Sequence, residues 1–169
     1  MTSARRQRKS LPAGIFLCLG AAVCFGSLLL VPASSGASTT TKVVSDWRTG
    51  LAIDGIDPVA YFTDGQPLMG KPDFEFRHEG VIWRFRNDGN RAAFAQNPDV
   101  YMPRYGGYDP VAVARGVAVA GNPLLWAVSR QRLYLFFSNA ARSQFAINSD
   151  KIVADAEAKW PGVSGNLTR

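Results

Sequence analysis

The sequence DPVA at residues 57–60 occurs again 52 residues later, and each copy precedes a similar stretch of chain. Within these stretches Gly70 recurs as Gly121 and Asp99 as Asp150, at a constant offset of 51 residues without a gap. Eight of the thirty aligned positions are identical, a level that suggests a duplication without proving it. A duplicated stretch predicts two similar structural units that pack together. We therefore expect a pseudo-two-fold domain in which the two DPVA loops occupy equivalent places beside a common cleft.

The first 37 residues have the features of a signal peptide. Four basic residues precede a charge-free, largely apolar run at 13–31, and small residues, including Ala33 and Ala37, follow that run. This order is typical of a cleaved export signal, so we expect a periplasmic or secreted protein. The alternative is an uncleaved membrane anchor, because nineteen mostly apolar residues nearly span a bilayer. The sequence leaves open whether the general or the twin-arginine export route is used.

Removal of this segment changes what the composition implies. The net charge falls from +6 to +2, because four basic and no acidic residues leave with it. The remaining charges are mixed along the chain, and this argues against a nucleic-acid partner. Cys18 and Cys24 both lie in the apolar run, so the mature chain has no disulfide and no thiolate ligand. Its fold must depend on a hydrophobic core, for which about 130 residues are enough.

Alternating apolar residues predict a hairpin in each copy of the repeated stretch, followed by a helix. In the first copy the strands lie on either side of a tight turn at Glu79-Gly80, where glycine accepts a positive φ. Asn87 or Asp88 is expected to cap the next helix, which carries Phe94 into the core.

In the second copy the turn is expected near residues 130–131. Apolar residues then occupy both faces of the strand, with Leu133 and Leu135 on one side and Tyr134 and Phe136 on the other. This pattern predicts a hairpin that is covered on both faces.

Two helices are expected after this hairpin. Asn139 is predicted to cap the first of them, and Ser149 or Asp150 the second. Pro161-Gly162 is expected to end the second helix. Its apolar stripe consists of Ile152, Val153, Ala156 and Trp160.

Two hairpin–helix (ββα) units indicate an α+β domain with antiparallel pairing, because a parallel sheet would need strands that alternate with helices. We expect the two units to form one domain over 45–163, with 38–44 as a flexible lead and 164–169 as a disordered tail. The four tryptophans fall in different predicted elements and are expected to lie in the core: Trp47, Trp83, Trp126 and Trp160.

Several short motifs accompany the DPVA copies. In the first half they are DPV at 57–59, FRHEG at 76–80, WRF at 83–85 and NRAAFAQNP at 90–98. Across the mature chain they also include YGGY at 105–108, GNP at 121–123, LYL at 133–135 and KWP at 159–161. The first set resembles the YHS domain family, small modules found in metal-handling and exported bacterial proteins. The full set is similar to an exported branch of that family that includes selenoproteins. The resemblance implies a YHS-like domain over about 110 residues and assigns no reaction.

The chain departs from the family pattern at its sulfur positions. Metal-binding YHS modules carry cysteines where this chain has Ala60, Arg86 and Asn90. None of these side chains is a thiolate, the ligand that soft metals prefer. The exported branch often carries cysteine or selenocysteine directly after YGGY, where this chain has Asp109. A redox role that depends on that sulfur does not carry over, and a carboxylate would favour harder cations or hydrogen-bonding ligands.

The candidate site residues each have a functional and a structural interpretation. Asp57 and Asp109 would lie together in a pseudo-two-fold domain and would hold a divalent metal ion or transfer a proton. The alternative is that each begins a turn by accepting bonds from nearby backbone N–H groups. His78, the only histidine, is in phase with Phe74 and Phe76 and is either a metal ligand or a packed ring.

The YGGY segment is the strongest candidate for a recognition loop. Its paired glycines allow close approach of a ligand, and its two phenols offer rigid hydrogen-bonding groups. The alternative is a tight turn with aromatic anchors in the core. The predicted ligand-binding set is Asp57, Tyr61, Tyr105, Gly106, Gly107, Tyr108 and Asp109, and the predicted metal ligands are His78, Asp57 and Asp109.

Three functions are compatible with these residues. The first is an exported, non-enzymatic binding module that holds a metal ion or a small polar ligand in an oxygen-rich pocket between the two repeats. The second is a degenerate thiol or selenol redox protein, or a hydrolase, although the sequence offers no set of nucleophile, base and orienting group. The third is a structural or partner-binding envelope protein, whose only membrane contact would be an uncleaved N-terminal segment.

Overall fold

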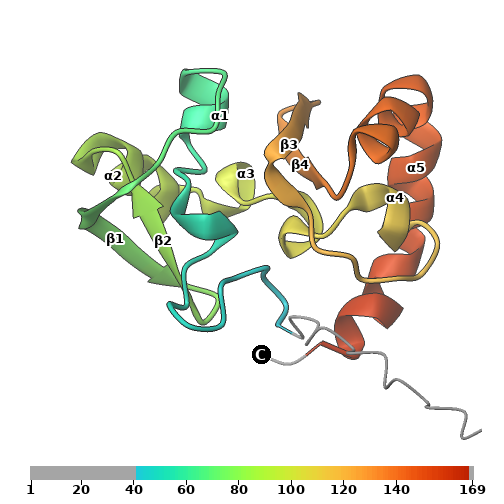
Figure 1. Ribbon diagram of the computed structural model, residues 1–169, viewed down its shortest axis with the longest axis horizontal. Helices are drawn as coiled ribbons and strands as arrows, with labels where there is room; N and C mark the ends of the chain where they lie inside the picture. The colour runs from blue at the N-terminus through green and yellow to red at the C-terminus, as the bar shows by residue number, and fades with distance from the viewer. Residues whose placement is uncertain (1–40, 168–169) are drawn as a thin grey trace, which may run out of the picture. The chain divides into compact units, whose positions relative to one another are not determined.

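The computed structural model describes residues 41–167, in which two β-hairpins are surrounded by helices (Figure 1). The first hairpin pairs β1 (Lys71–His78) with β2 (Val81–Phe85), and the second pairs β3 (Asn122–Ser129) with β4 (Arg132–Phe136). Both sheets are antiparallel and two-stranded. The other elements are η1 (Ile53–Gly55), α1 (Ala60–Thr63), α2 (Asp88–Gln96), α3 (Pro98–Tyr101), η2 (Arg104–Gly107), α4 (Pro110–Val113) and α5 (Asn139–Gly165). The predicted α+β class and the order of hairpin and helix are confirmed.

The two hairpins have the same register at an offset of 51 residues. Phe76 pairs with Trp83 in the first hairpin, and Ala127 pairs with Tyr134 in the second. Each hairpin has an irregularity four residues long after the start of its first strand. Both turns contain two residues with positive φ, which matches the right-handed twist of the flanking strands.

Side chains from both faces of β4 lie in hydrophobic cores. Leu133 and Leu135 are fully buried in a core shared with the first hairpin, where Phe94 of α2 is also buried. Tyr134 and Phe136 are buried in a second core together with Phe145 of α5. The prediction that this hairpin is covered on both faces is therefore confirmed.

Helix capping follows the sequence in the first half and differs by one residue in the second. The Asn87 side chain caps α2 by accepting from the Asn90 N–H. In α5 the cap is Ser138, whose hydroxyl accepts from the Ala141 N–H, so the predicted cap at Asn139 is wrong by one position. Ser138 lies 51 residues after Asn87, so the two caps are at equivalent positions.

The last helix is longer than the sequence indicated. The backbone leaves helical geometry at Asn148 (φ −133°), near the expected second cap, and the helix resumes directly. It then continues through Pro161 to Gly165, so the predicted end at Pro161-Gly162 and a tail from 164 are wrong. Proline costs this helix one backbone hydrogen bond, and burial of Val163 stabilises the turn that follows. The predicted stripe is confirmed in that Ile152 and Ala156 are buried.

Two expectations near the start of the described chain also change. Val43 is 3% exposed and the Val44 N–H donates to the Gly106 carbonyl, so these residues belong to the folded part and not to a flexible lead. Trp47 is 86% exposed, because it lies in a turn held by Asp46, whose carboxylate accepts from the Thr49 N–H. The predicted signal segment lies outside the described residues. Within 41–167 no helix has the length and apolar character needed to cross a membrane.

Candidate functional site

The two DPVA aspartates are buried and make matching hydrogen bonds. Asp57 Oδ1 accepts from the Val59 N–H and Asp109 Oδ1 from the Val111 N–H, both at 2.8 Å. The second oxygen of Asp57 accepts from the Arg86 N–H at 2.8 Å, and that of Asp109 accepts from the Phe137 N–H at 3.0 Å. Each carboxylate thus begins a turn and ties it to the end of a hairpin. The structural interpretation of these aspartates accounts for their contacts.

The first aspartate has one additional partner. Asn90 Nδ2 donates to Asp57 Oδ2 at 2.6 Å. Two of the three positions where the YHS resemblance would place cysteines therefore contact this carboxylate, Arg86 through its backbone N–H and Asn90 through its amide. The third, Ala60, donates its N–H to the backbone carbonyl of Asp57. An amide and two backbone donors are present where thiolates would otherwise be expected.

The predicted metal ligands do not come together. Asp57 and Asp109 use their oxygens within separate loops, and His78 lies beside neither of their hydrogen-bond networks. The His78 ring instead stacks on Phe76 and contacts the edge of Phe94. Within residues 41–167, no three His, Cys, Asp or Glu side chains form a group suited to a metal ion. The expectation of a site built from His78, Asp57 and Asp109 is corrected accordingly.

Tyr61 joins the two halves of the domain. Its hydroxyl donates to the Pro123 carbonyl at 2.8 Å, and its ring meets that of Trp126 edge-on at 5.2 Å. Burial raises the pKa of the hydroxyl, with a smaller effect from the negative charge of Asp54. The side chain is 2% exposed, so it connects the halves and does not line an open pocket.

The YGGY segment is a buried turn with one exposed side. Tyr105 (φ 55°) and Gly106 (φ 62°) have left-handed backbone conformations, as do Ile53 and Asp54 at the equivalent positions of the first half. A Cβ on Gly106 would lie 1.9 Å from the Lys42 carbonyl oxygen, so glycine is needed for close packing of the chain. The recurrence in the first half indicates that this geometry belongs to the architecture.

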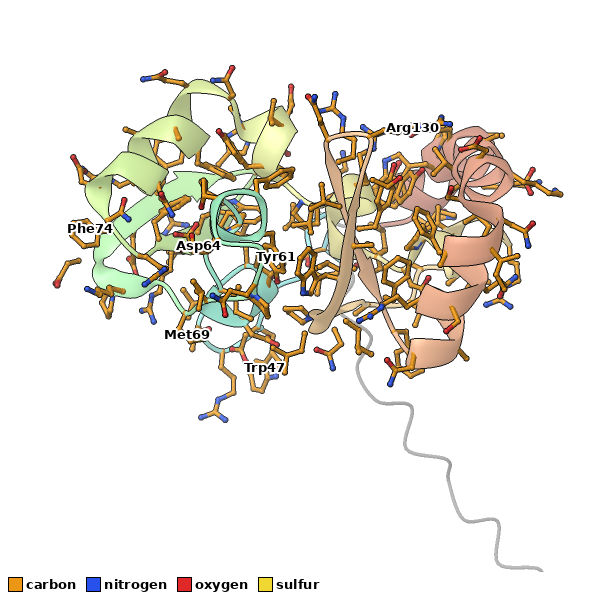
Figure 2. All side chains as sticks on the ribbon, turned by 90° about the horizontal axis from the view of Figure 1, so that it is seen from above. Trp47, Tyr61, Asp64, Met69, Phe74 and Arg130 are labelled. Atoms are coloured by element: carbon orange, nitrogen blue, oxygen red, sulfur yellow. The ribbon has the colours of Figure 1, made fainter. Side chains whose placement is uncertain are left out.

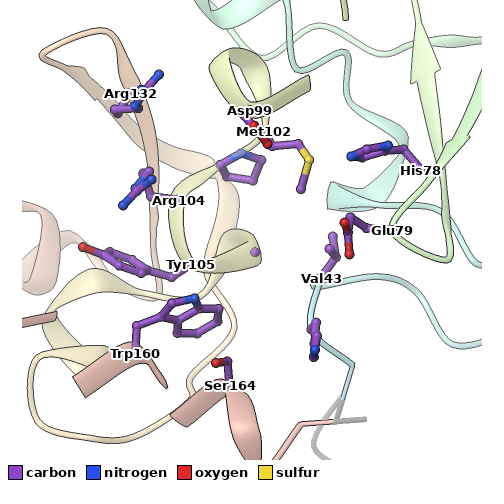
Figure 3. Close-up of a pocket in the computed structure, with 13 residues that line it drawn as sticks. Val43, His78, Glu79, Asp99, Met102, Arg104, Tyr105, Arg132, Trp160 and Ser164 are labelled. Atoms are coloured by element: carbon purple, nitrogen blue, oxygen red, sulfur yellow. The ribbon is translucent and has the colours of Figure 1, made fainter. Parts of the chain in front are cut away.

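A cleft of about 520 Å³ opens beside this turn (Figure 3). Its lining comes from the turn after β1, the segment from α3 to η2, the start of β4 and the end of α5. The lining residues are Lys42, Val43, His78, Glu79, Asp99, Met102, Pro103, Arg104, Tyr105, Gly106, Arg132, Trp160 and Ser164. Of the predicted site residues, His78, Tyr105 and Gly106 line it, whereas Asp57, Tyr61, Gly107, Tyr108 and Asp109 do not.

Four charged side chains of the cleft have no ion-pair partner in the described part of the chain. They are two cations, Lys42 and Arg132, and two carboxylates, Glu79 and Asp99. In Figure 3, Arg132 lies on the same wall as Arg104, and Glu79 lies across the cleft beside His78. A cleft lined by charges of both signs suits a ligand that carries both a negative group and a donor group.

Arg104 forms part of the cationic wall. Its guanidinium donates to Glu157 and lies 5.5 Å from the Tyr105 ring centre. Burial acts to lower the pKa of Arg104, but the bond to Glu157 and the charge of Glu157 raise it overall. The Nε atom is buried and has no hydrogen-bond partner among the described residues.

Sequence patterns gave no indication of the cleft charges. Lys42, Asp99 and Arg132 are single charged residues in separate segments, and isolated charges usually lie on a solvated surface. Glu79 was predicted as a turn residue and Asp99 as the end of the repeated stretch, and neither as part of a site. Their proximity depends on how the two halves pack, which no local pattern encodes.

A second groove, of about 610 Å³, has a different character. Three of its lining side chains are apolar and more than half exposed: Met69, Leu124 and Phe137. Among residues 41–167, Asp54 is the one charged residue in its lining.

Comparison with known proteins gives no family. The chain matches no protein-family model, no curated protein and no solved structure.

Proposed function

We propose that this chain is an exported, YHS-like binding module that holds a small polar molecule in the cleft beside the YGGY turn. The observation that carries the proposal is the set of four charged side chains without ion-pair partners within residues 41–167, all of which face this cleft. Charges in a cleft with mutual partners would indicate structural ion pairs. Lys42, Glu79 and Asp99 are exposed and Arg132 is partly buried, so water solvates these charges in the free protein. A ligand with complementary groups would replace that water.

The ligand class follows from the positions of the charges. Arg132 and the partly exposed guanidinium of Arg104 would receive a carboxylate or phosphate, because guanidinium donors match the geometry of these anions. Glu79 and Asp99 would accept from an ammonium or hydroxyl group of the same molecule. Free amino acids and small hydroxy acids fit this description. The proposed ligand is a small molecule and not a metal ion, because the predicted metal ligands His78, Asp57 and Asp109 do not come together.

Binding without catalysis is the function that we infer. The carboxylates that were candidates for an acid–base pair, Asp57 and Asp109, accept from backbone N–H groups in separate loops. The motifs shared with the YHS family support the choice of a small binding module. The matching register and aspartate contacts support a pseudo-two-fold relation between the halves, which we propose arose by duplication.

Export is the remaining part of the proposal. It is supported by the basic start, the apolar run and the small residues of the first 37 positions. N-terminal sequencing of the protein recovered from its cells would locate a cleavage site near Ala37, whereas an intact N-terminus in the membrane fraction would indicate an anchor.

A thermal-shift screen tests the binding function. The probes are the free amino acids, lactate, malate, succinate and inorganic phosphate, since a bound molecule stabilises the folded state by mass action. We expect at least one probe to raise the Tm of the wild type, and Arg132→Ala or Glu79→Ala to abolish that rise. Arg130→Ala is the matched control, because Arg130 lies in the neighbouring turn and pairs with Asp150 outside the cleft. A panel that gives no shift, or a shift that survives both cleft variants, would contradict the proposal.

A further inference from the structure

Each half of the domain has one outer strand, and the two outer strands differ in charge. β1 and β3 are equivalent strands, and each pairs on one side only, with β2 or β4, within residues 41–167. The inner strands also bridge to a third segment, since Ile82 bridges to Leu51 and Leu133 bridges to Pro103. β1 and β3 are therefore the edge strands. An edge strand presents unpaired backbone groups on which another strand can pair.

The edge of the first half carries charges and that of the second half carries none. Charged side chains in edge strands prevent unwanted pairing. β1 contains Lys71, Asp73, Glu75 and Arg77, and the equivalent positions of β3 are Asn122, Leu124, Trp126 and Val128. Just beyond the hairpins, Arg86 in the first half corresponds to Phe137 in the second.

The uncharged edge is accompanied by exposed apolar side chains. Leu124 is 61% exposed, Phe137 is 63% exposed and Met69 is 62% exposed, and all three line the second groove. Val128 is also exposed, farther along β3 toward the turn that contains Arg130, which Figure 2 labels. Large apolar side chains that gather at one groove commonly mark an interaction surface.

We propose that the β3 edge is the interface of a homodimer, in which β3 of a second copy pairs antiparallel to it. The charge pattern of β3 favours a second copy of this chain as the partner. In a two-fold contact a residue near the axis meets its own counterpart, so a charged residue there would face a like charge. All eight residues of β3 are uncharged. Pro123 has no N–H to donate and its carbonyl accepts from Tyr61, so the part of the strand that can pair with a second copy runs from Leu124 to Ser129. Two copies of β1 paired in the same way would bring like charges together wherever the two-fold axis passed near the centre of the strand, because every second residue from Lys71 to Arg77 is charged.

The paired edges would extend two hairpins into one four-stranded antiparallel sheet. Leu124, Phe137 and Met69 would then be covered by the partner copy, which explains why they are apolar. This interface lies on other residues than the cleft, since the lining of the cleft includes none of these three.

Substitutions that give the second half the charged residues of the first half test the dimer. Leu124→Asp and Val128→Arg place the residues of β1 at the equivalent positions of β3, and Phe137→Arg does the same for Arg86. Ile147→Arg is the control, because Ile147 is exposed on α5 and does not line the groove. Sedimentation velocity of the full chain, as recovered from the cells that produce it, measures the oligomeric state. We expect a wild-type dimer, a dissociation constant raised at least about tenfold by each β3 or Phe137 variant, and no change in Ile147→Arg.

Cysteine cross-linking locates the contact in the same full chain. With Cys18 and Cys24 replaced by serine, single cysteines are introduced at each position from 124 to 128. A disulfide-linked dimer should form at one or two adjacent positions nearest the axis and not with Ile147→Cys. Circular dichroism confirms that each variant is folded. A monomeric wild type, a dimer insensitive to the charge variants, or cross-linking without a position preference would overturn the proposal, and a monomer that binds a foreign strand at β3 would do so as well.

Discussion

Asp57 Oδ2 accepts a hydrogen bond of 2.8 Å from the backbone N–H of Arg86, and this contact joins the first DPVA loop to the end of β2. The Asp57→Ala substitution leaves three donors without an acceptor: the N–H groups of Val59 and Arg86 and the amide of Asn90. Unsatisfied buried donors are costly, so the free energy of unfolding should fall by about 3 kcal/mol or more. Urea denaturation measures this change. Asp64→Ala serves as a control and should cost less than about 1 kcal/mol, because its ion pair with Arg86 is partly exposed.

The equivalent substitution in the second half should be less costly. Asp109 satisfies two backbone donors and has no counterpart of Asn90, because residue 141 is alanine. We expect Asp109→Ala to lower the unfolding free energy by about 2 kcal/mol, less than Asp57→Ala. The same denaturation experiment gives the order. Equal losses, or a larger loss for Asp109, would show that the third contact of Asp57 does not contribute.

Gly70 and Gly121 should not tolerate a side chain. A Cβ on Gly70 would lie 2.5 Å from the Arg84 carbonyl carbon, and one on Gly121 would lie 2.6 Å from the Leu135 Cβ. Alanine at either position must displace the hairpin, at a cost of about 2 kcal/mol or more in unfolding free energy. Gly162→Ala in α5 is the matched control, because its Cβ would meet no atom within 4 Å. It should be neutral or stabilising by up to about 1 kcal/mol. A mild effect at Gly70 and Gly121 would argue against the packing described.

The buried hydroxyl of Tyr61 should produce a loss of stability at high pH. Burial raises its pKa in the folded state, whereas an unfolded tyrosine ionises near pH 10. Its contribution is therefore fully present below about pH 10 and is lost as the pH rises through the folded pKa. Tyr61→Phe removes the bond to the Pro123 carbonyl and should cost about 1 kcal/mol at neutral pH. Denaturation between pH 8 and about pH 11.5 should show the two proteins converging. Parallel curves over that range would contradict this account.

Local sequence patterns were sufficient to predict the two hairpins and the first helix cap. The apolar alternation and the Glu79-Gly80 turn placed β1 and β2, and Asn87 acts as the cap that its position indicated. The aspartates were also foreseen in their structural role, because an Asx turn needs only the residue and the two that follow. These features depend on contacts within a few residues along the chain.

One local turn and two long-range features were not indicated by the sequence. Trp47 was expected in the core with the other tryptophans, but a turn at Asp46 projects it into solvent. Pro161 was expected to end α5, and burial of Val163 keeps the helix intact. The cleft assembles Lys42, Glu79, Asp99 and Arg132 from segments up to 90 residues apart, and only the fold brings their charges together.

The central claim is that the cleft beside Gly106 binds a small polar molecule while the DPVA aspartates hold the fold together. Amide chemical-shift mapping of the ¹⁵N-labelled chain, titrated with the free amino acids and with the hydroxy acid malate, tests this claim most directly. We predict that the amides of Val43, Gly106 and Arg132 shift in a saturable manner, and that those of Asp57 and Asp109 do not. Shifts centred on the two DPVA loops, or none with any of these probes, would contradict the account.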